Sequence, residues 1–303
     1  MNSNQIFMNF STSVINYLNV ENEKEAISRF YDELVSELTV RYSVAHYQVD
    51  NALSSLVYNY RHMKNGRTPQ ECDYNNISSC IGYLHQYAPC HSCMVYAIIH
   101  ELWRQPLIEI FYLRIKNTLN VTFIGSGPGN DFVGFLSALQ GTLGFVLNMN
   151  VTFVDKMQGW ENIVLATIEK LRNGGCGNAE NVYKRINVKV SFLKSDITKI
   201  ALFDQALQIN LKTTEVVFLV KALSTIPDEY KHSALKNIIP HMKPGAILIF
   251  IDCPYPHQLS TLNFRLREIY QKMNTKYTCS SRTRFGHKNI TRCRADAKVF
   301  VKI

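Results

Sequence analysis

The chain has 303 residues, of which 46% are hydrophobic and 19% are charged, and its formal net charge is +9. This composition excludes an intrinsically disordered protein, and apolar runs such as 246–251 are far shorter than the roughly 18 residues that a membrane-spanning helix needs. The basic excess is concentrated in residues 276–303, where eight Lys and Arg accompany one Asp, so this segment either attracts phosphates or an acidic partner or forms a solvated basic hairpin.

The N-terminal part of the chain, residues 1–117, has a helical pattern. Apolar residues recur at spacings of three and four within 6–18 and again within 27–38, as an amphipathic helix requires. Two further helices are expected over about 77–87 and 92–104, because a proline closely follows each of them. We therefore expect an all-helical N-terminal region.

After Asn120 the chain alternates short β-rich runs with amphipathic segments. The β-rich runs are 121–125, 151–154, 188–193, 215–220 and 246–252. The amphipathic segments lie near 131–140, 160–172, 198–209, 226–240 and 259–273. Alternation of this kind predicts right-handed βαβ units and a parallel sheet with helices on both faces.

Two final β-like runs, 276–281 and 297–303, have no helix between them, so they should pair antiparallel. The predicted fold class is α/β, a doubly wound, mostly parallel seven-stranded sheet with a C-terminal antiparallel hairpin. We expect a helical N-terminal domain or lid over 1–117 and the α/β domain over 118–303.

The most informative motif follows the first β run, where GSGPG places three glycines at 125, 127 and 129. Glycines permit positive φ and leave the backbone bare, and the next helix presents free N–H groups that Asn130 or Asp131 can cap. A nucleotide-like ligand is therefore expected at this loop. The spacing is G-x-G-x-G, with Asn130 in the third place of the dinucleotide fingerprint G-x-G-x-x-G, which disfavours pyrophosphate binding.

This glycine spacing resembles motif I of the class I S-adenosylmethionine-dependent methyltransferases, and the resemblance extends over residues 118–303. The runs FLVKALSTIP and MKPGAILIFID resemble the family's fourth strand with its loop and the turn into its fifth strand. The resemblance implies S-adenosylmethionine as the cofactor. The cofactor-binding residues it implies are Gly125, Ser126, Gly127, Pro128, Gly129, Asp131, Asp155, Lys156, Asp196 and Ile197.

Two aspartates have roles implied by the family. Asp155 ends the second β run and corresponds to the acid that accepts hydrogen bonds from both ribose hydroxyls, whereas the alternative is a strand-end turn residue. Asp196 follows the third run and resembles the acid that binds the adenine amino group, although Asp is also common in turns. Trp160 either stacks near adenine or packs in the core.

One position departs from the family pattern. The family usually has an acid two residues before the first glycine of motif I, where it helps to hold the methionine amino group, and this chain has Phe123. The loss either weakens cofactor binding or transfers the task to Asp131. Both a diverged active enzyme and a catalytically silent relative fit this departure.

Residues that contact the methyl acceptor should come from the loops after the fourth and fifth β runs. The catalytic candidates are Lys221, Tyr255 and His257, of which His257 has the pKa of a general base but is also typical of a solvated position before a helix. The Asn-Pro-Pro-Tyr type of motif is absent after the fourth run, which disfavours base N-methylation of that kind. The acceptor stays unidentified.

The cysteines do not indicate a metal site. Cys90 and Cys93 invite a zinc interpretation together with Cys72 and Cys80, but the spacings fit no usual ligand framework, so free thiols are favoured and no metal is expected. The first 25 residues lack the features of a signal peptide, so we expect an intracellular protein, cytoplasmic or nuclear.

Three functions fit these observations. The first is a methyltransferase whose helical N-terminal half covers the substrate. The second is a silent protein with the same fold that binds RNA or a protein partner through the basic C-terminal hairpin. The third is a nicotinamide-dependent oxidoreductase, against which the glycine spacing argues.

Overall fold

The structure is a computed structural model that describes residues 3–63, 72–199, 205–254 and 264–303, with the backbone alone given for 3–18 and 62–63. Its helices are α1 (Ser3–Arg41), α2 (His46–Met63), α3 (Ile77–Gln86), α4 (Ala88–Leu102), α5 (Ile108–Arg114), α6 (Asn130–Leu139), α7 (Trp160–Asn173), α8 (Gly177–Arg185), α9 (Gln205–Thr213), α10 (Asp228–Ile238) and the 3-10 turns η2 (Leu223–Thr225) and η3 (Ile239–His241). Its strands are β1 (Thr118–Ile124), β2 (Asn148–Asp155), β3 (Asn187–Lys194), β4 (Val216–Val220), β5 (Ile247–Asp252), β6 (Leu266–Thr278), β7 (Thr283–Arg284), β8 (His287–Lys288) and β9 (Arg292–Lys302).

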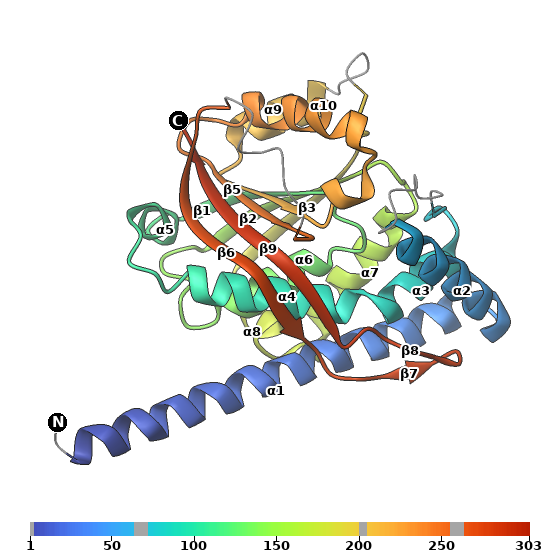
Figure 1. Cartoon of the computed structure of the whole chain (residues 1–303), viewed down its shortest axis with the longest axis horizontal. Helices are drawn as coiled ribbons and strands as arrows, with labels where there is room; N and C mark the ends of the chain where they lie inside the picture. The colour runs from blue at the N-terminus through green and yellow to red at the C-terminus, as the bar shows by residue number, and fades with distance from the viewer. Residues whose placement is uncertain (1–2, 64–71, 200–204, 255–263) are drawn as a thin grey trace.

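Seven strands form one sheet in the order β3-β2-β1-β4-β5-β9-β6 (Figure 1). Strands β1 to β5 pair parallel, and β9 pairs antiparallel with both β5 and β6. This arrangement confirms the predicted fold class. Because β1 lies between β2 and β4, the strand order reverses there, and the carboxyl ends of β1 and β4 form the switch point at which ligands bind in open α/β sheets.

The predicted amphipathic segment 259–273 is wrong where the structure describes it, because β6 occupies these residues from Leu266 onward. Two register shifts, between Glu268 and Tyr270 and between Lys272 and Thr275, interrupt the pairing of β6 with β9. Such irregularities disturb the two-residue period of a strand. The apolar residues 266, 269, 270 and 273 therefore have the spacing of a helix although they lie in a strand.

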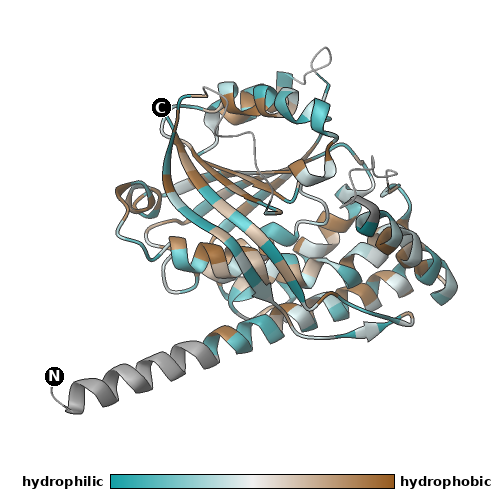
Figure 2. Cartoon of the chain, in the orientation of Figure 1, coloured by the Kyte–Doolittle hydropathy of each residue, from teal (hydrophilic) through white to brown (hydrophobic). Residues whose placement is uncertain are grey.

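Two hydrophobic cores cover the two faces of the sheet. Alternate residues of β4 point to opposite cores: Phe218 belongs to the larger one, and Val217 and Leu219 belong to the smaller one. The smaller core is covered by α9 and α10, and the larger one by α4, α6, α7 and α8 (Figure 1). The central strands are hydrophobic along their length (Figure 2), as burial of both faces of a parallel sheet requires.

The N-terminal helices share the larger core with the sheet, since buried side chains of α1, α3 and α4 belong to the same cluster as those of β1 and α6. Gly134 of α6 lies directly against α4, where an added Cβ would come within 2.4 Å of the Ser92 carbonyl oxygen. The secondary structure changes from helices to alternating strands and helices at Thr118. The division into domains at 117 and 118 stays a prediction.

The short hairpin β7–β8 lies against the N-terminal helices (Figure 1). Arg282 and Arg284 form ion pairs with Glu25 and Asp32 of α1. His287 Nε2 is 2.7 Å from a carboxylate oxygen of Asp50 in α2. Among the helices of the described residues, none has the length and apolar character that crossing a bilayer requires.

Phe123 lies at the centre of a cluster of phenylalanines. Its ring stacks on Phe218 at 4.6 Å and on Phe153 at 5.6 Å between centroids, and it meets Phe132 and Phe135 edge-on. The side chain is 1% exposed. A carboxylate at this position would be surrounded by rings, so the departure from the family pattern has a packing role.

Replacing Phe123 with Asp tests this packing. We expect Phe123→Asp to lower the unfolding free energy by at least about 3–5 kcal/mol, because the ring contacts are lost and a carboxyl group is buried without partners. The matched change Phe123→Leu should cost under about 1.5 kcal/mol. Urea unfolding measures both, and equal stabilities of the two variants would contradict the burial of this position.

Candidate functional site

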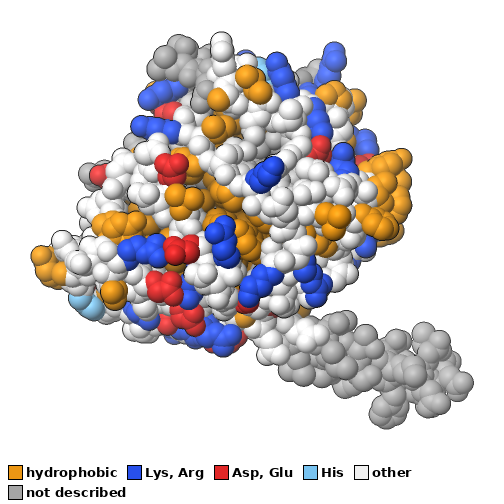
Figure 3. All heavy atoms as spheres, turned by 180° about the vertical axis from the view of Figure 1, so that it is seen from behind, with side chains coloured by type: hydrophobic (Ala, Val, Ile, Leu, Met, Phe, Trp, Pro, Cys, Tyr) orange, Lys and Arg blue, Asp and Glu red, His pale blue; other side chains and the backbone are white. Residues whose placement is uncertain are grey.

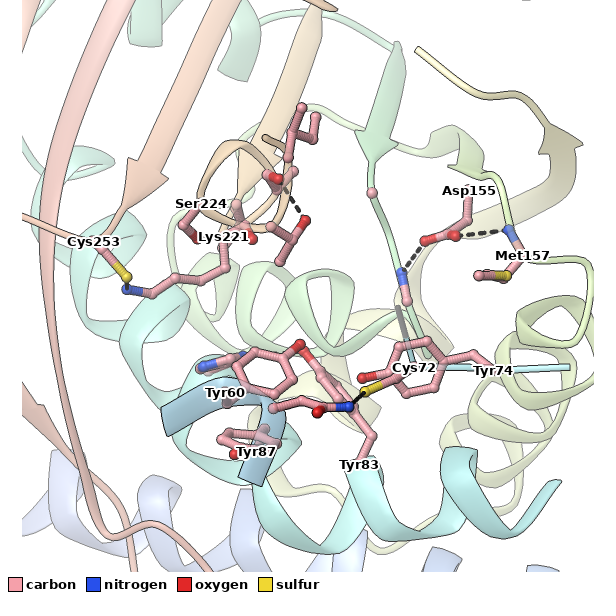
Figure 4. Close-up of a pocket in the computed structure, with 18 of the residues that line it drawn as sticks. Tyr60, Cys72, Tyr74, Tyr83, Tyr87, Asp155, Met157, Lys221, Ser224 and Cys253 are labelled. Atoms are coloured by element: carbon pink, nitrogen blue, oxygen red, sulfur yellow. Dashed lines mark hydrogen bonds between the residues drawn. The ribbon is translucent and has the colours of Figure 1, made fainter. Parts of the chain in front are cut away.

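A cavity of about 1360 Å³ lies at the switch point of the sheet. Its walls come from the loops that follow β1, β2, β3, β4 and β5, from α2 and α3 with the segment between them, and from β6 and β9. In Figure 4, Asp155 and Met157 lie at one end, Lys221 and Cys253 at the other, and tyrosines line the side formed by the N-terminal helices. The cavity is larger than the roughly 300–1,000 Å³ of most ligand pockets, so it has room for two small molecules.

The glycine loop has the conformation that only glycine adopts without strain. The φ values of Gly125, Gly127 and Gly129 are +64°, +49° and +80°. An added Cβ would approach Ala222 Cβ to 2.8 Å at the first position and Phe153 to 3.3 Å at the third. At Gly127 the nearest atom would be 3.9 Å away, so this residue presents bare backbone to open space.

Asp155 holds the glycine loop and its own turn together. Its two carboxylate oxygens accept hydrogen bonds from the backbone N–H groups of Gly127 and Met157, each at 3.0 Å (Figure 4). Burial raises the pKa of this carboxyl group, although the two backbone hydrogen bonds oppose the rise. Each carboxylate oxygen retains a lone pair for a further donor from the cavity.

Asp196 lies at the edge of the same cavity and stabilises the turn after β3. One carboxylate oxygen accepts from Thr198 N–H at 3.1 Å and from Thr198 Oγ1 at 2.6 Å, and the other is 3.4 Å from Lys199 Nζ. Burial raises the pKa of this group, but the contacts with Thr198 and Lys199 outweigh it, and the pKa is lowered overall. The residue thus acts in a turn and also faces the cavity.

The structure brings part of the predicted cofactor set to the cavity wall. The predicted residues that line the cavity are Gly125, Gly127, Asp155, Lys156, Asp196 and Ile197. Ser126, Pro128 and Gly129 do not belong to the described lining. Asp131 is also outside it: its buried carboxylate accepts from Asn130 Nδ2 at 2.7 Å, and burial raises its pKa strongly.

An aromatic wall, which sequence reasoning missed apart from Trp160, covers the cavity from the N-terminal side. It consists of Tyr60, Tyr74, Tyr83, Tyr87 and Trp160 (Figure 4 labels the tyrosines). The rings of Tyr74 and Trp160 are 4.5 Å apart and those of Tyr60 and Tyr87 are 4.7 Å apart. Their spacing along the chain has no single period, so only the fold assembles them.

His91 extends this wall and is held neutral. Its Nδ1 is 3.2 Å from the Tyr83 hydroxyl. Burial, with a smaller contribution from the positive charge of Lys221, lowers the pKa of His91 to about 3. A histidine in this state donates or accepts hydrogen bonds but carries no charge near neutral pH.

Lys221 is the one catalytic candidate whose position is described; Tyr255 and His257 lie outside the described residues. It follows β4 with a φ of +52°, a conformation that non-glycine residues adopt at a cost. Its Nζ donates to the Arg294 carbonyl oxygen at 3.0 Å and lies 3.4 Å from Cys253 Sγ. The side chain therefore links the end of β4 to the loop after β5 and to β9.

The cysteines of the proposed zinc interpretation do not converge. Cys80 Sγ donates to the Tyr74 carbonyl oxygen at 3.1 Å, and Cys72 Sγ contacts Asn59 Nδ2 at 3.6 Å. The Cys90 thiol instead contacts those of Cys279 and Cys293. No group of three or more His, Cys, Asp or Glu side chains within the described ranges has the arrangement of a metal site.

No protein-family model and no curated protein matches the sequence. An O-methyltransferase family protein from Burkholderia thailandensis aligns with 85% of this chain and 72% of its own, at 9% identity and a TM-score of 0.47. Magnesium protoporphyrin IX methyltransferase from Synechocystis PCC 6803 with bound SAM aligns with 72% of this chain and 84% of its own, at 12% identity and a TM-score of 0.40. N-methyltransferase NodS from Bradyrhizobium japonicum WM9 in complex with S-adenosyl-L-homocysteine aligns with 69% and 98%, at 13% identity and a TM-score of 0.38.

The pKa of His91 predicts an acid-dependent loss of stability. Its folded-state pKa of about 3 lies below the value of about 6.5 expected in the unfolded chain. The unfolded state therefore binds the extra proton between these values, and stability falls as the pH drops through this range, by up to about 1.4 kcal/mol per pH unit.

We expect His91→Gln to remove this contribution, so that between pH 6 and pH 4 the variant loses about 2–3 kcal/mol less than the unchanged chain. Urea unfolding at several pH values measures this effect. The difference in unfolding free energy between the two proteins at pH 7 gives the effect of the substitution on packing alone. Parallel stability curves for the two proteins would show that His91 is free to protonate in the folded state.

Proposed function

We propose that this chain is an S-adenosylmethionine-dependent methyltransferase whose cofactor occupies the cavity at the switch point. The observation that supports it most is the pair formed by Gly127 and Asp155. Gly127 presents backbone without a side chain to the cavity, and the carboxylate of Asp155 is fixed beside it by the Gly127 N–H group. Bare backbone next to a carboxylate suits a ligand that has a ribose and an amino-acid end.

The residues that would hold the cofactor are those of the predicted set that line the cavity. Asp155 would accept hydrogen bonds from the ribose hydroxyls, Asp196 from the adenine amino group, and the backbone of Gly125 and Gly127 would lie against the amino-acid end. When bound, the cofactor supplies an electrophilic methyl group on a sulfonium centre. The contribution of the chain is to orient the two substrates and to exclude water.

The alternative is a catalytically silent protein that binds RNA or a protein partner. It is motivated by Phe123, which stands where the methyltransferase family usually has an acid. Part of the basic charge of the C-terminal segment is already neutralised, because Arg282, Arg284 and Lys298 form ion pairs within the chain. Fewer of its positive charges are therefore available to RNA than the sequence suggests. The opposite face of the molecule, which Figure 3 shows from behind, has Lys and Arg side chains interspersed with Asp and Glu and so presents no uniformly basic surface either. We therefore favour the enzyme, and propose an intracellular location for it.

Calorimetric titration separates the candidate functions. We expect S-adenosylmethionine and its demethylated product S-adenosylhomocysteine to bind, and NAD not to bind. Binding of single-stranded RNA with a steep salt dependence, together with no binding of either adenosyl compound, would favour the silent protein instead.

The role of Asp155 predicts a specific loss of affinity. Asp155→Ala should weaken S-adenosylhomocysteine binding by about 1–3 kcal/mol, because two ribose hydroxyls lose their acceptor. Asp228→Ala is the matched control, since this aspartate lies in the first turn of α10 with an 87% exposed side chain. Titration of both variants measures the effect, and an unchanged affinity of Asp155→Ala would remove this residue from the site.

The bare backbone of Gly127 predicts that a methyl group there blocks the ligand rather than the fold. Gly127→Ala should lower the unfolding free energy by about 1–2 kcal/mol, the cost of a positive φ for alanine, and weaken S-adenosylhomocysteine binding at least about tenfold. Gly141→Ala is the matched control: Gly141 has a φ of +74°, nothing lies within 4 Å of its added Cβ, and it does not line the cavity. Equal affinities of the two variants would show that no ligand approaches Gly127.

A further inference from the structure

Three basic side chains of the C-terminal strands line the same cavity: Lys276 of β6, and Arg292 and Arg294 of β9. Lys276 pairs with Arg294 across the two strands, and Arg292 is two residues away on the same face of β9. The three charges therefore gather on one face of the antiparallel pair. We call them the basic triad.

Among the residues that the structure describes, no carboxylate forms an ion pair with the basic triad. Neither Lys276 nor Arg292 makes an ion pair with any described residue, and Arg294 donates only to the Asn274 side-chain oxygen, at 3.2 Å. By contrast, Arg282, Arg284 and Lys298 of the same segment are paired with Glu25, Asp32 and Glu268. Like charges directly opposite each other on neighbouring strands are destabilising, so an anion between Lys276 and Arg294 would relieve a cost present in the free chain.

The strands that carry the triad adjoin Lys221, which lies at the end of the cavity opposite Asp155 in Figure 4. Lys221 Nζ reaches the Arg294 carbonyl oxygen at 3.0 Å, which brings a fourth basic side chain to this end. Asp155 and Asp196 are the acidic members of the described lining, and both belong to the loops after β2 and β3. Lys156 also lines the cavity, and its positive charge acts on both aspartates. One end of the cavity thus combines two carboxylates with a lysine, whereas the other end has basic side chains and no carboxylate in the described lining.

The positive end adjoins the aromatic wall. Ile290, which lines the cavity just before β9, donates its N–H to the Gln86 carbonyl oxygen at 3.1 Å, and Gln86 precedes Tyr87 of the wall. The ring of Tyr87 lies 6.0 Å from that of His91, which is held neutral. A ligand at this end therefore meets aromatic faces on one side and basic groups on the other.

We propose that the methyl acceptor is a small planar molecule with an anionic group, a carboxylate or a phosphate, that the basic triad binds. The role of this molecule as methyl acceptor rests on the proposed function, but the anion site itself does not depend on it. The ring of such a molecule stacks against the aromatic wall, and its anionic group accepts charge-assisted hydrogen bonds from the triad.

Small probes test the proposal by ligand-observed NMR on the chain saturated with S-adenosylhomocysteine. Benzoate and phenyl phosphate should bind at least about tenfold more tightly than benzyl alcohol or benzylamine, which have a similar ring but no negative charge. The stronger of the two anions identifies the anionic group. Equal binding of benzylamine and the anions would overturn the proposal.

The variant Lys276→Gln/Arg292→Gln/Arg294→Gln should bind the anions at least about tenfold more weakly while its affinity for S-adenosylhomocysteine stays unchanged. The matched control is Lys189→Gln/Lys212→Gln/Lys288→Gln, which removes the same charge from residues that do not line the cavity. Equal anion affinities of the two triple variants would overturn the proposal, because general electrostatic attraction would then explain the binding.

Two further outcomes separate this proposal from the proposed function. Anion binding that depends on the triad, in a chain that binds no adenosyl compound, would sustain the anion site and contradict the methyltransferase. Single-stranded RNA that displaces benzoate and binds more tightly than phenyl phosphate by several orders of magnitude would overturn the small-molecule acceptor.

Discussion

The hydrogen bonds that Asp155 accepts from Gly127 and Met157 are the constraint on which the candidate site depends. A buried carboxylate needs such donors, and here they come from the loop after β1 and the turn after β2. The parallel pairing of these strands, with Ile124 opposite Val154, brings both loops to one edge of the sheet. The sheet, the glycine conformation and the carboxylate therefore form one structural unit.

The N-terminal helices complete this unit. The segment before α3 lies against Gly159, where an added Cβ would come within 2.1 Å of the Tyr74 carbonyl oxygen, and the Asn75 side chain accepts from Gly159 N–H at 3.1 Å. Tyr74 also packs its ring on Trp160. The helices thus contact the turn that follows Asp155, and their tyrosines give the cavity its aromatic side. A cavity with both carboxylates at one end, a cluster of basic side chains at the other and aromatic rings along one side suits two different ligands held next to each other.

Local signals made much of the fold predictable. The five parallel strands are short and separated by helical segments, those inside the sheet are largely apolar, and three glycines after the first of them indicate a ligand loop. Strand β6 is predictable only at its end, where 276–278 belong to a β-like run, because its register shifts give the apolar residues of 266–273 a helical spacing. The aromatic wall depends on contacts between distant residues, such as that of Tyr74 with Trp160, so no local pattern could assemble it. The sequence shows the basic cluster of 276–303, but not that three of its residues line the cavity. Nor does the sequence show that Phe123 fills an aromatic cluster instead of leaving a cofactor contact vacant.

A crystal structure of the chain grown with S-adenosylhomocysteine would show whether Asp155 and Gly127 bind the cofactor. We expect both ribose hydroxyl oxygens to lie about 3 Å from the carboxylate of Asp155 and the amino-acid end to lie over the backbone of Gly127. Electron density for the ligand at another place, or protein side chains filling the space in front of Gly127 in crystals that contain the ligand at saturating concentration, would contradict this expectation.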